Sequence, residues 1–285
     1  MHCWPAMAAN GANYKRPRKE IMPKITRVYY QVEKNKEALS HAAADWIASS
    51  IESAIAASGV ARIAISGGNT PRRAFELLAD VSQPFRRRID WSRLFLFWVD
   101  ERCVPPGDKD SNYRMTREAL LSKVPLPEAN IVRIEGELDP EEAAARYESA
   151  IRTKFRLEGA EVPRFDLIEL GMGDDGHTAS LFPHSAALDS MMRLAVANHV
   201  EAKNPWRITL TWPVINHASK VFFLIQDASK AQVLHDVLLG PYQPEIWPSQ
   251  LIRPKSGELY LLLDEDAAAL LPPTVGGNGV LEVGR

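Results

Sequence analysis

Short apolar segments alternate with amphipathic segments along most of this chain, and this alternation limits the fold more than any other feature. The segments 62–66, 94–99, 165–170 and 221–225 have the length and composition of buried strands. Between the strands, residues 36–57 carry apolar side chains three and four positions apart, which predicts a long amphipathic helix. The alternation predicts an α/β fold with a mainly parallel sheet covered by helices on both faces.

Other elements follow from local signals. Thr70-Pro71 and Asp139-Pro140 each place a capping residue before a proline, which predicts a helix start, and the second helix is expected to run to about Phe155. The segment 94–99 is apolar throughout, as expected for a central parallel strand. We expect further helices over 112–122, over 229–239 and after residue 264, and further strands over 194–200, 208–211 and 260–263.

The ends of the chain differ from the middle. Residues 1–24 lack a regular apolar pattern, and residues 274–285 contain three glycines, so we expect a flexible N-terminal extension and a flexible C-terminal tail. One domain over residues 25–273 is expected between them. The first residues also lack the apolar core of a secretory signal.

Composition excludes several classes of protein. The 34 basic and 36 acidic residues give a net charge of −2, which offers no long-range attraction to nucleic acid or to an anionic membrane. No apolar run approaches the roughly 18 residues that cross a bilayer. Cys3 and Cys103 lack zinc-site or redox spacing, which indicates unpaired thiols in a reducing, cytoplasmic setting.

The first candidate site is the stretch Ser66, Gly67, Gly68, Asn69 and Thr70, between a strand end and a helix start. Glycines let a backbone approach a ligand closely, and a helix N-terminus presents unpaired amide donors and the positive end of the dipole. The stretch therefore suits a phosphate, although a plain tight turn before a helix has the same composition. The lysine of a nucleotide P-loop and the glycine spacing of a dinucleotide site are missing.

The second candidate site is the glycine-rich segment 171–183, which also follows an apolar strand. It holds Asp174, Asp175 and His177. Histidine is the usual general base at neutral pH, and a nearby carboxylate can fix its tautomer and raise its basicity. A glycine-rich turn with a surface histidine is the alternative, but the position at a strand end favours a site.

Charged side chains at other strand ends complete the set. Asp100, Glu101 and Arg102 follow the strand 94–99, where they could contact a ligand or brace the loops. Arg207 precedes the strand 208–211, and Lys230 lies at a helix start, where a lysine opposes the helix dipole unless an anion binds. No metal-binding cluster and no serine-hydrolase elbow is present in the sequence.

Taken together, these segments resemble the 6-phosphogluconolactonase family over about residues 25–265. The segment Asp175-Gly176-His177-Thr178-Ala179-Ser180-Leu181-Phe182-Pro183 carries most of the resemblance. The other matching segments, in chain order, are residues 65–71, 98–105, 110–113, 207–211 and 229–231.

The resemblance implies a single Rossmann-like domain and hydrolysis of 6-phospho-D-glucono-1,5-lactone, the second step of the oxidative pentose phosphate pathway. It implies no metal and no organic cofactor. The expected partner is the small phosphosugar substrate, with no nucleic acid and no membrane, and the chain is expected to act as a monomer or a small homo-oligomer. We expect His177 to activate a water and Asp175 to orient its imidazole. The 6-phosphate is expected on the amides of residues 67–70, with Arg207 and Lys230 as cationic contacts. Loop amides or Arg102 are the candidate oxyanion donors.

Two alternatives remain. Glucosamine-6-phosphate deaminases of the same superfamily carry Asp-Glu-Tyr where this chain has Asp100-Glu101-Arg102, and Ile-Ala-Phe-Asn-Glu-Pro where it has residues 178–183. Both departures favour the lactonase. A non-catalytic sugar-phosphate sensor would keep the phosphate loop, but could dispense with the Asp175/His177 pair.

Overall fold

The computed structural model describes residues 25–201, 205–274 and 276–284. The predicted extension over residues 1–24 lies outside the described residues. Within the described part of the chain, no helix is both long enough and apolar enough to cross a membrane.

An eight-stranded sheet forms the centre of the molecule, with the order β11-β1-β10-β9-β6-β2-β3-β5. Seven of its strands are parallel to their neighbours, and β11 alone pairs antiparallel, to β1. The predicted mainly parallel sheet is therefore confirmed. In chain order the strands are β1 (Ile25–Glu33), β2 (Ala61–Ile65), β3 (Leu94–Trp98), β5 (Ile131–Val132), β6 (Leu167–Leu170), β9 (Lys220–Ile225), β10 (Glu258–Asp264) and β11 (Asn278–Gly284).

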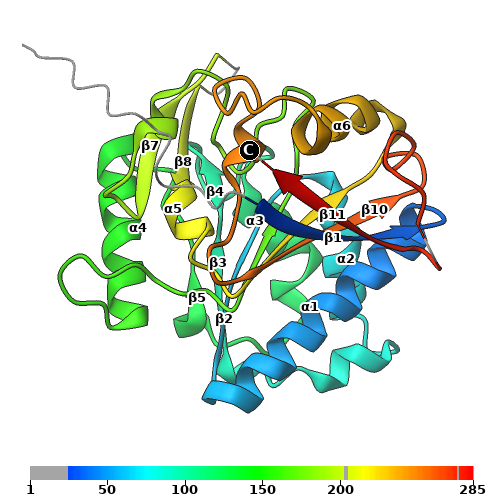
Figure 1. The fold of residues 1–285 in the computed structure, drawn as a ribbon. Helices are drawn as coiled ribbons and strands as arrows, with labels where there is room; N and C mark the ends of the chain where they lie inside the picture. Colours follow the sequence, from blue (N-terminus) through cyan, green and yellow to red (C-terminus); the bar gives the residue numbers. More distant parts are fainter. Residues whose placement is uncertain (1–24, 202–204, 275, 285) are drawn as a thin grey trace, which may run out of the picture.

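Helices lie on both sides of this sheet, with α1 below it and α6 above it in Figure 1. Trp46 of α1 packs against Phe222 of β9 and Tyr260 of β10, with ring centroids 5.6 and 4.5 Å apart. Tyr147 of α4 exchanges hydrogen bonds with the backbone of Trp98, at the end of β3. The helices are α1 (Lys36–Ser58), α2 (Asn69–Ala79), α3 (Asn112–Ala119), α4 (Pro140–Phe155), α5 (Trp212–Ile215) and α6 (Ala231–Leu239).

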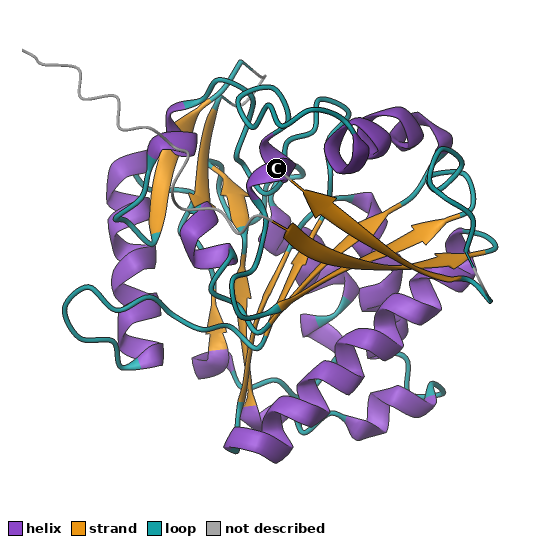
Figure 2. Cartoon of the chain, in the orientation of Figure 1, coloured by secondary structure: helices purple, strands orange, loops and turns teal. Residues whose placement is uncertain are grey.

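A second, three-stranded antiparallel sheet stands beside the first (Figure 2), with the order β4-β8-β7. Its strands are β4 (Asp100–Arg102), β7 (Ala195–His199) and β8 (Trp206–Leu210). We predicted the last two as strands but counted them in the parallel alternation, which is wrong. Only residues 200–205 separate β7 from β8 along the chain, and parallel neighbours need a crossover of about a dozen residues or more.

Three other expectations need correction. Residues 278–284 form β11 and Val283 is buried, so the described part of the predicted C-terminal tail is an edge strand. Gly276 and Gly277, both at positive φ, turn the chain back along β1, and this turn was mistaken for flexibility. Residues 265–270 form turns, so the described residues after Asp264 do not contain the expected helix. Finally, β3 is not central but lies one strand from the end of the sheet.

Candidate functional site

One cleft at the carboxyl ends of the parallel strands brings together the segments that the sequence singled out. It has a volume of about 410 Å³, within the usual range of small-molecule sites. Every predicted substrate-binding residue lines it, and so does His177: the residues are Ser66, Gly67, Gly68, Asn69, Thr70, Arg102, His177, Arg207 and Lys230. Asp175 does not line the cleft and reaches it only through the His177 ring.

The loop after β2 leads directly into α2. The helix begins at Asn69, and its N-cap is Gly68, at φ 95° and without a side-chain cap. The prediction of Thr70 as the N-cap is therefore wrong, because the helix starts before that residue. Gly67 is needed for a different reason: a Cβ there would lie 1.8 Å from Oδ1 of Asn112. The N-terminus of this 11-residue helix thus faces the cleft without a side chain that satisfies its amides.

The loop after β6 holds His177 in a tight turn. Its backbone carbonyl accepts a 2.9 Å hydrogen bond from Gly173 N, and the turn places Gly176 at φ 72°. Asp175 Oδ1 lies 2.5 Å from His177 Nδ1 and also accepts from His177 N at 3.1 Å. Asp175 thus fixes Nδ1, which leaves Nε2 for contacts with a ligand.

The contact with His177 lowers the pKa of the Asp175 carboxyl. Partial burial by itself would raise the pKa of the Asp175 carboxyl, but the hydrogen bond and the charge of His177 outweigh it and hold the pKa below its usual value. The carboxylate is therefore ionised at neutral pH, which is the form that stabilises a protonated imidazole.

The His177 ring is confined by its neighbours. Phe182 stacks on it with ring centroids 4.1 Å apart and an interplanar angle of 22°. Gly173 lies so close that a Cβ there would be 2.1 Å from His177 Nδ1. The imidazole is thus oriented by packing as well as by its hydrogen bond to Asp175.

Three cations from three different elements surround the cleft. Arg102 donates to the carbonyl of Asp110 at 2.6 Å. Burial, followed by the nearby charge of Arg102, lowers the pKa of Arg207. Lys230 Nζ lies 2.5 Å from Oδ1 of Asp174, and the Lys230 side chain is only 21% exposed. An anion in the cleft would relieve the repulsion between the two guanidinium groups.

The structure distinguishes the two acids after β3. Glu101 is buried and accepts backbone hydrogen bonds from Arg102, Asn112 and Tyr113, so it braces the start of α3. Burial raises the pKa of Glu101 in spite of these donors. Asp100, in contrast, lines the cleft.

Sequence reasoning left the role of Asp100 open between ligand contact and loop bracing, and it gave no role to Asn112 or Ser180, which also line the cleft. Asp100 Oδ2 accepts a 2.6 Å hydrogen bond from Ser180 Oγ, and Asn112 Nδ2 donates to the Asp100 carbonyl at 2.9 Å. Asn112 Oδ1 is buried without a partner. These residues lie in the motif segments 98–105, 110–113 and 171–183, and this was the only indication in the sequence that they belong to the site. Which of their side chains face the cleft depends on the tertiary packing.

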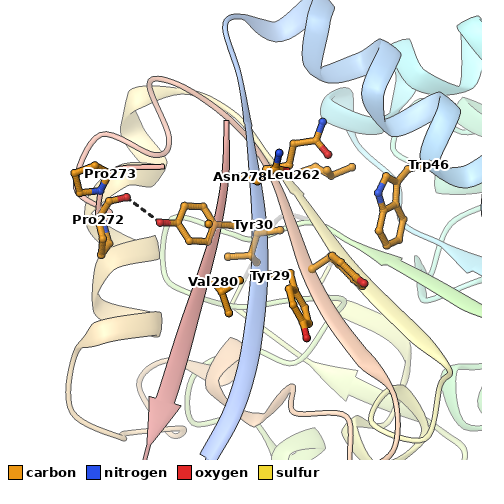
Figure 3. A pocket seen from close by; sticks show the side chains of 12 residues that line it. Tyr29, Tyr30, Trp46, Leu262, Pro272, Pro273, Asn278 and Val280 are labelled. Carbon is orange, nitrogen blue, oxygen red and sulfur yellow. Dashed lines mark hydrogen bonds between the residues drawn. The ribbon is translucent and has the colours of Figure 1, made fainter. Parts of the chain in front are cut away.

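A larger hollow lies elsewhere, beside β1, β10 and β11 (Figure 3). Its volume is about 540 Å³, and Tyr29, Trp46 and Tyr260 form an aromatic wall, with Tyr29 and Tyr260 stacked 5.1 Å apart. None of the residues that line it is charged, so it offers no counterion to a phosphate. Among the described residues, no group of three or more His, Cys, Asp and Glu side chains is arranged to hold a metal ion.

Comparison with known sequences gives consistent matches over most of the chain. A family model described as glucosamine-6-phosphate isomerases/6-phosphogluconolactonase matches residues 34–261. The 6-phosphogluconolactonase of Synechocystis sp. is 42% identical over 240 residues, which cover 84% of this chain and 96% of the relative. Probable 6-phosphogluconolactonase 1 of Arabidopsis thaliana is 37% identical over 253 residues, which cover 85% and 92%.

Solved structures agree with the sequence matches. The 6-phosphogluconolactonase from Trypanosoma cruzi superposes with a TM-score of 0.73 at 30% identity, covering 86% of this chain and 97% of that one. A monomeric glucosamine-6-phosphate deaminase superposes with a TM-score of 0.70 at 19% identity, covering 85% and 99%, a likeness that concerns the fold alone.

Proposed function

The chain belongs to the glucosamine-6-phosphate isomerase/6-phosphogluconolactonase family, and from this premise we propose that it hydrolyses 6-phospho-D-glucono-1,5-lactone to 6-phospho-D-gluconate in the oxidative pentose phosphate pathway. One observation carries the proposal: the Asp175-supported His177 and the glycine loop at the start of α2 line the same cleft. A phosphosugar has an anionic end for the loop and a reactive ring for the histidine.

Anchoring of the phosphate comes first in the proposed mechanism. The 6-phosphate accepts hydrogen bonds from the backbone amides of residues 67–70, at the positive end of the α2 dipole. Lys230 and Arg207 add charge-assisted hydrogen bonds, which are roughly twice as strong as neutral ones. Binding at this end places C1 of the lactone near His177.

In the second stage, the His177 imidazole acts as the general base for hydrolysis. Neutral His177 takes a proton from a water through Nε2 as the water oxygen attacks C1. The carbonyl oxygen becomes an oxyanion, for which Arg102 and the loop amides are our candidate donors. When the bond between C1 and the ring oxygen breaks, the imidazolium returns the proton to the departing oxygen. Between these two steps, Asp175 stabilises the imidazolium.

Two side chains favour lactone hydrolysis over deamination. Phe182, which stacks on the His177 ring, occupies the position where the related deaminases carry a glutamate. Arg102 stands where they carry a tyrosine, and it adds positive charge to the cleft. Because residue 182 is a phenylalanine here, this chain lacks the carboxylate that the deaminases have at that position.

A coupled assay tests the proposal. Glucose-6-phosphate dehydrogenase generates the lactone, the protein is added, and acid release is followed above the spontaneous rate. Acceleration of acid release supports lactonase activity. Release of ammonia from glucosamine 6-phosphate would identify a deaminase instead. Binding of 6-phosphogluconate without any turnover of the lactone would identify a sensor.

Replacing Lys230 by alanine is expected to raise KM about 10- to 100-fold with little change in kcat, because a hydrogen bond to a charged group contributes about 1.5–3 kcal/mol. Steady-state kinetics in the coupled assay measures both constants. Lys36→Ala is the matched control, since Lys36 also pairs with an aspartate, Asp227, but lies outside the cleft. A loss confined to kcat would contradict an anchoring role for Lys230.

Replacing Asp174 by asparagine is expected to have the opposite effect on KM. Asp174 is 78% exposed and pairs with Lys230, so it competes with the phosphate for that ammonium group. Exposed ion pairs contribute about 0–1 kcal/mol, so KM is expected to fall by up to about fivefold. An increase in KM would show that Asp174 assists binding rather than competing with it.

A further inference from the structure

A buried acid that the mechanism does not use lies against the phosphate loop. Glu169, on β6, has no exposed surface. Its Oε2 accepts a 2.7 Å hydrogen bond from the backbone N–H of Ser66, and its Oε1 accepts a 3.0 Å hydrogen bond from the Ser66 hydroxyl. Ser66 is the first residue after β2, so this carboxylate holds the chain at the point where the loop leaves the sheet.

The surroundings of Glu169 supply little positive charge. Its neighbour on β9 is Phe222, and the residues that α1 and α2 bury against the sheet are all uncharged. The ionisable groups on the loop side are those of the cleft: Asp100, Arg102, His177, Arg207 and Lys230. Asp100 is the one whose charge acts on Glu169 most directly.

Burial therefore decides the protonation of this carboxyl. It raises the pKa of Glu169 to about 7, helped by the charge of Asp100 and opposed by the two hydrogen bonds from Ser66. Small changes in nearby charge then change the fraction of Glu169 that is ionised at neutral pH.

We propose that Glu169 is a positioning residue of the phosphate loop, and that its ionisation weakens the binding of an anion to that loop. The inference rests on the phosphate site of the proposed function. An anionic carboxylate below the loop opposes a dianion above it, whereas the neutral acid does not. Because linkage is reciprocal, binding of the dianion draws a proton onto Glu169.

The sign of the pH dependence follows. Below the pKa of Glu169 the carboxyl is neutral and the anion binds tightly. Above it the carboxylate is ionised and affinity falls. A substrate phosphate gains charge over the same range, which would mask the effect, so the probe must keep a constant charge.

Sulfate is a suitable probe because it stays a dianion across this range. Its Kd is measured by titration calorimetry for the wild type and for Glu169→Gln, between about pH 5.5 and about pH 8.5. Glutamine keeps an acceptor for Ser66 N but never ionises. We expect equal affinities at the acid end, and about tenfold weaker binding by the wild type at the alkaline end, a typical coupling between two sites. Every other ionisable group is the same in the two proteins, so the ratio of their Kd values isolates Glu169.

Asp166→Asn is the matched control. Burial raises the pKa of the Asp166 carboxyl as well, although Asp166 is only partly buried. Asp166 accepts a 2.7 Å hydrogen bond from Arg62 N at the opposite end of the same pair of strands. This variant is expected to keep the pH dependence of the wild type.

Proton uptake gives a second test, and its first part uses the wild type alone. Calorimetry of the wild type near pH 7, in two buffers of different ionisation enthalpy, is expected to show uptake of a fraction of a proton per sulfate. Glu169→Gln is expected to take up less. A pH-independent Kd ratio, no proton uptake by the wild type, or equal uptake by the two proteins would overturn the role of Glu169 and leave the lactonase proposal intact. Failure of sulfate to bind the wild type at any pH would overturn the phosphate site itself.

Discussion

His177→Ala is expected to lower kcat for lactone hydrolysis about 10²- to 10⁴-fold, the usual contribution of a general base. A carboxylate orients this imidazole, because Asp175 Oδ1 lies 2.5 Å from His177 Nδ1. The other ring nitrogen, Nε2, is left for the water in the cleft. Its removal leaves the α2 amides, Arg207 and Lys230 in place, so KM is expected to change little. The coupled assay measures both constants, after subtraction of spontaneous hydrolysis.

His235→Ala is the control for this prediction. His235 also faces an aspartate, with Nδ1 3.1 Å from Asp236 Oδ1, but it does not line the cleft. Its replacement is expected to leave kcat and KM unchanged. If purified His177→Ala kept the wild-type kcat, the general-base assignment would be wrong.

Gly173→Ala is expected to lower kcat about 10²-fold, although it adds a single methyl group. That methyl would lie 2.1 Å from His177 Nδ1 and 2.7 Å from Asp175 Oδ1, far inside van der Waals contact. The His177 ring has little room to move, because it also stacks on Phe182. Displacement of a catalytic group by about 1 Å can cost about 10²-fold in rate.

Circular dichroism and thermal unfolding should accompany the kinetics of Gly173→Ala, so that a folding defect is not mistaken for a catalytic one. Gly107→Ala is the control, because a Cβ at that exposed loop position meets nothing within 4 Å. A Gly173→Ala protein that is folded and fully active would show that the orientation of the imidazole has little effect on the rate.

Helix positions were the most predictable part of the fold, because their signals are local. Asp139 caps α4 by accepting from the backbone N–H groups of Glu141 and Glu142, and the helix runs from Pro140 to Phe155 as expected. The start of α1 was equally well placed, with Asn35 accepting from Ala38 N. The start of α2 was misjudged because a glycine, without a capping side chain, occupies its N-cap.

Strand pairing was less predictable, because the sequence of a strand does not specify which other strand it pairs with. The apolar alternation in 278–284 is short and follows two glycines, so only pairing with β1 distinguishes it from a tail. The same holds for β7 and β8, whose composition fits either sheet but whose short connection makes them an antiparallel pair.

The sequence alone determined the two glycine-rich loops and the identity of the imidazole, since these depend on neighbours along the chain. Tertiary structure decided which acids lie near them. Glu169 is about a hundred positions from Ser66, and Asp100 is eighty from Ser180, yet the strand order brings each pair within hydrogen-bond distance. A side chain's protonation and orientation depend on distance in space and on burial, which are fixed only when the sheet has formed and its helices have packed on both faces.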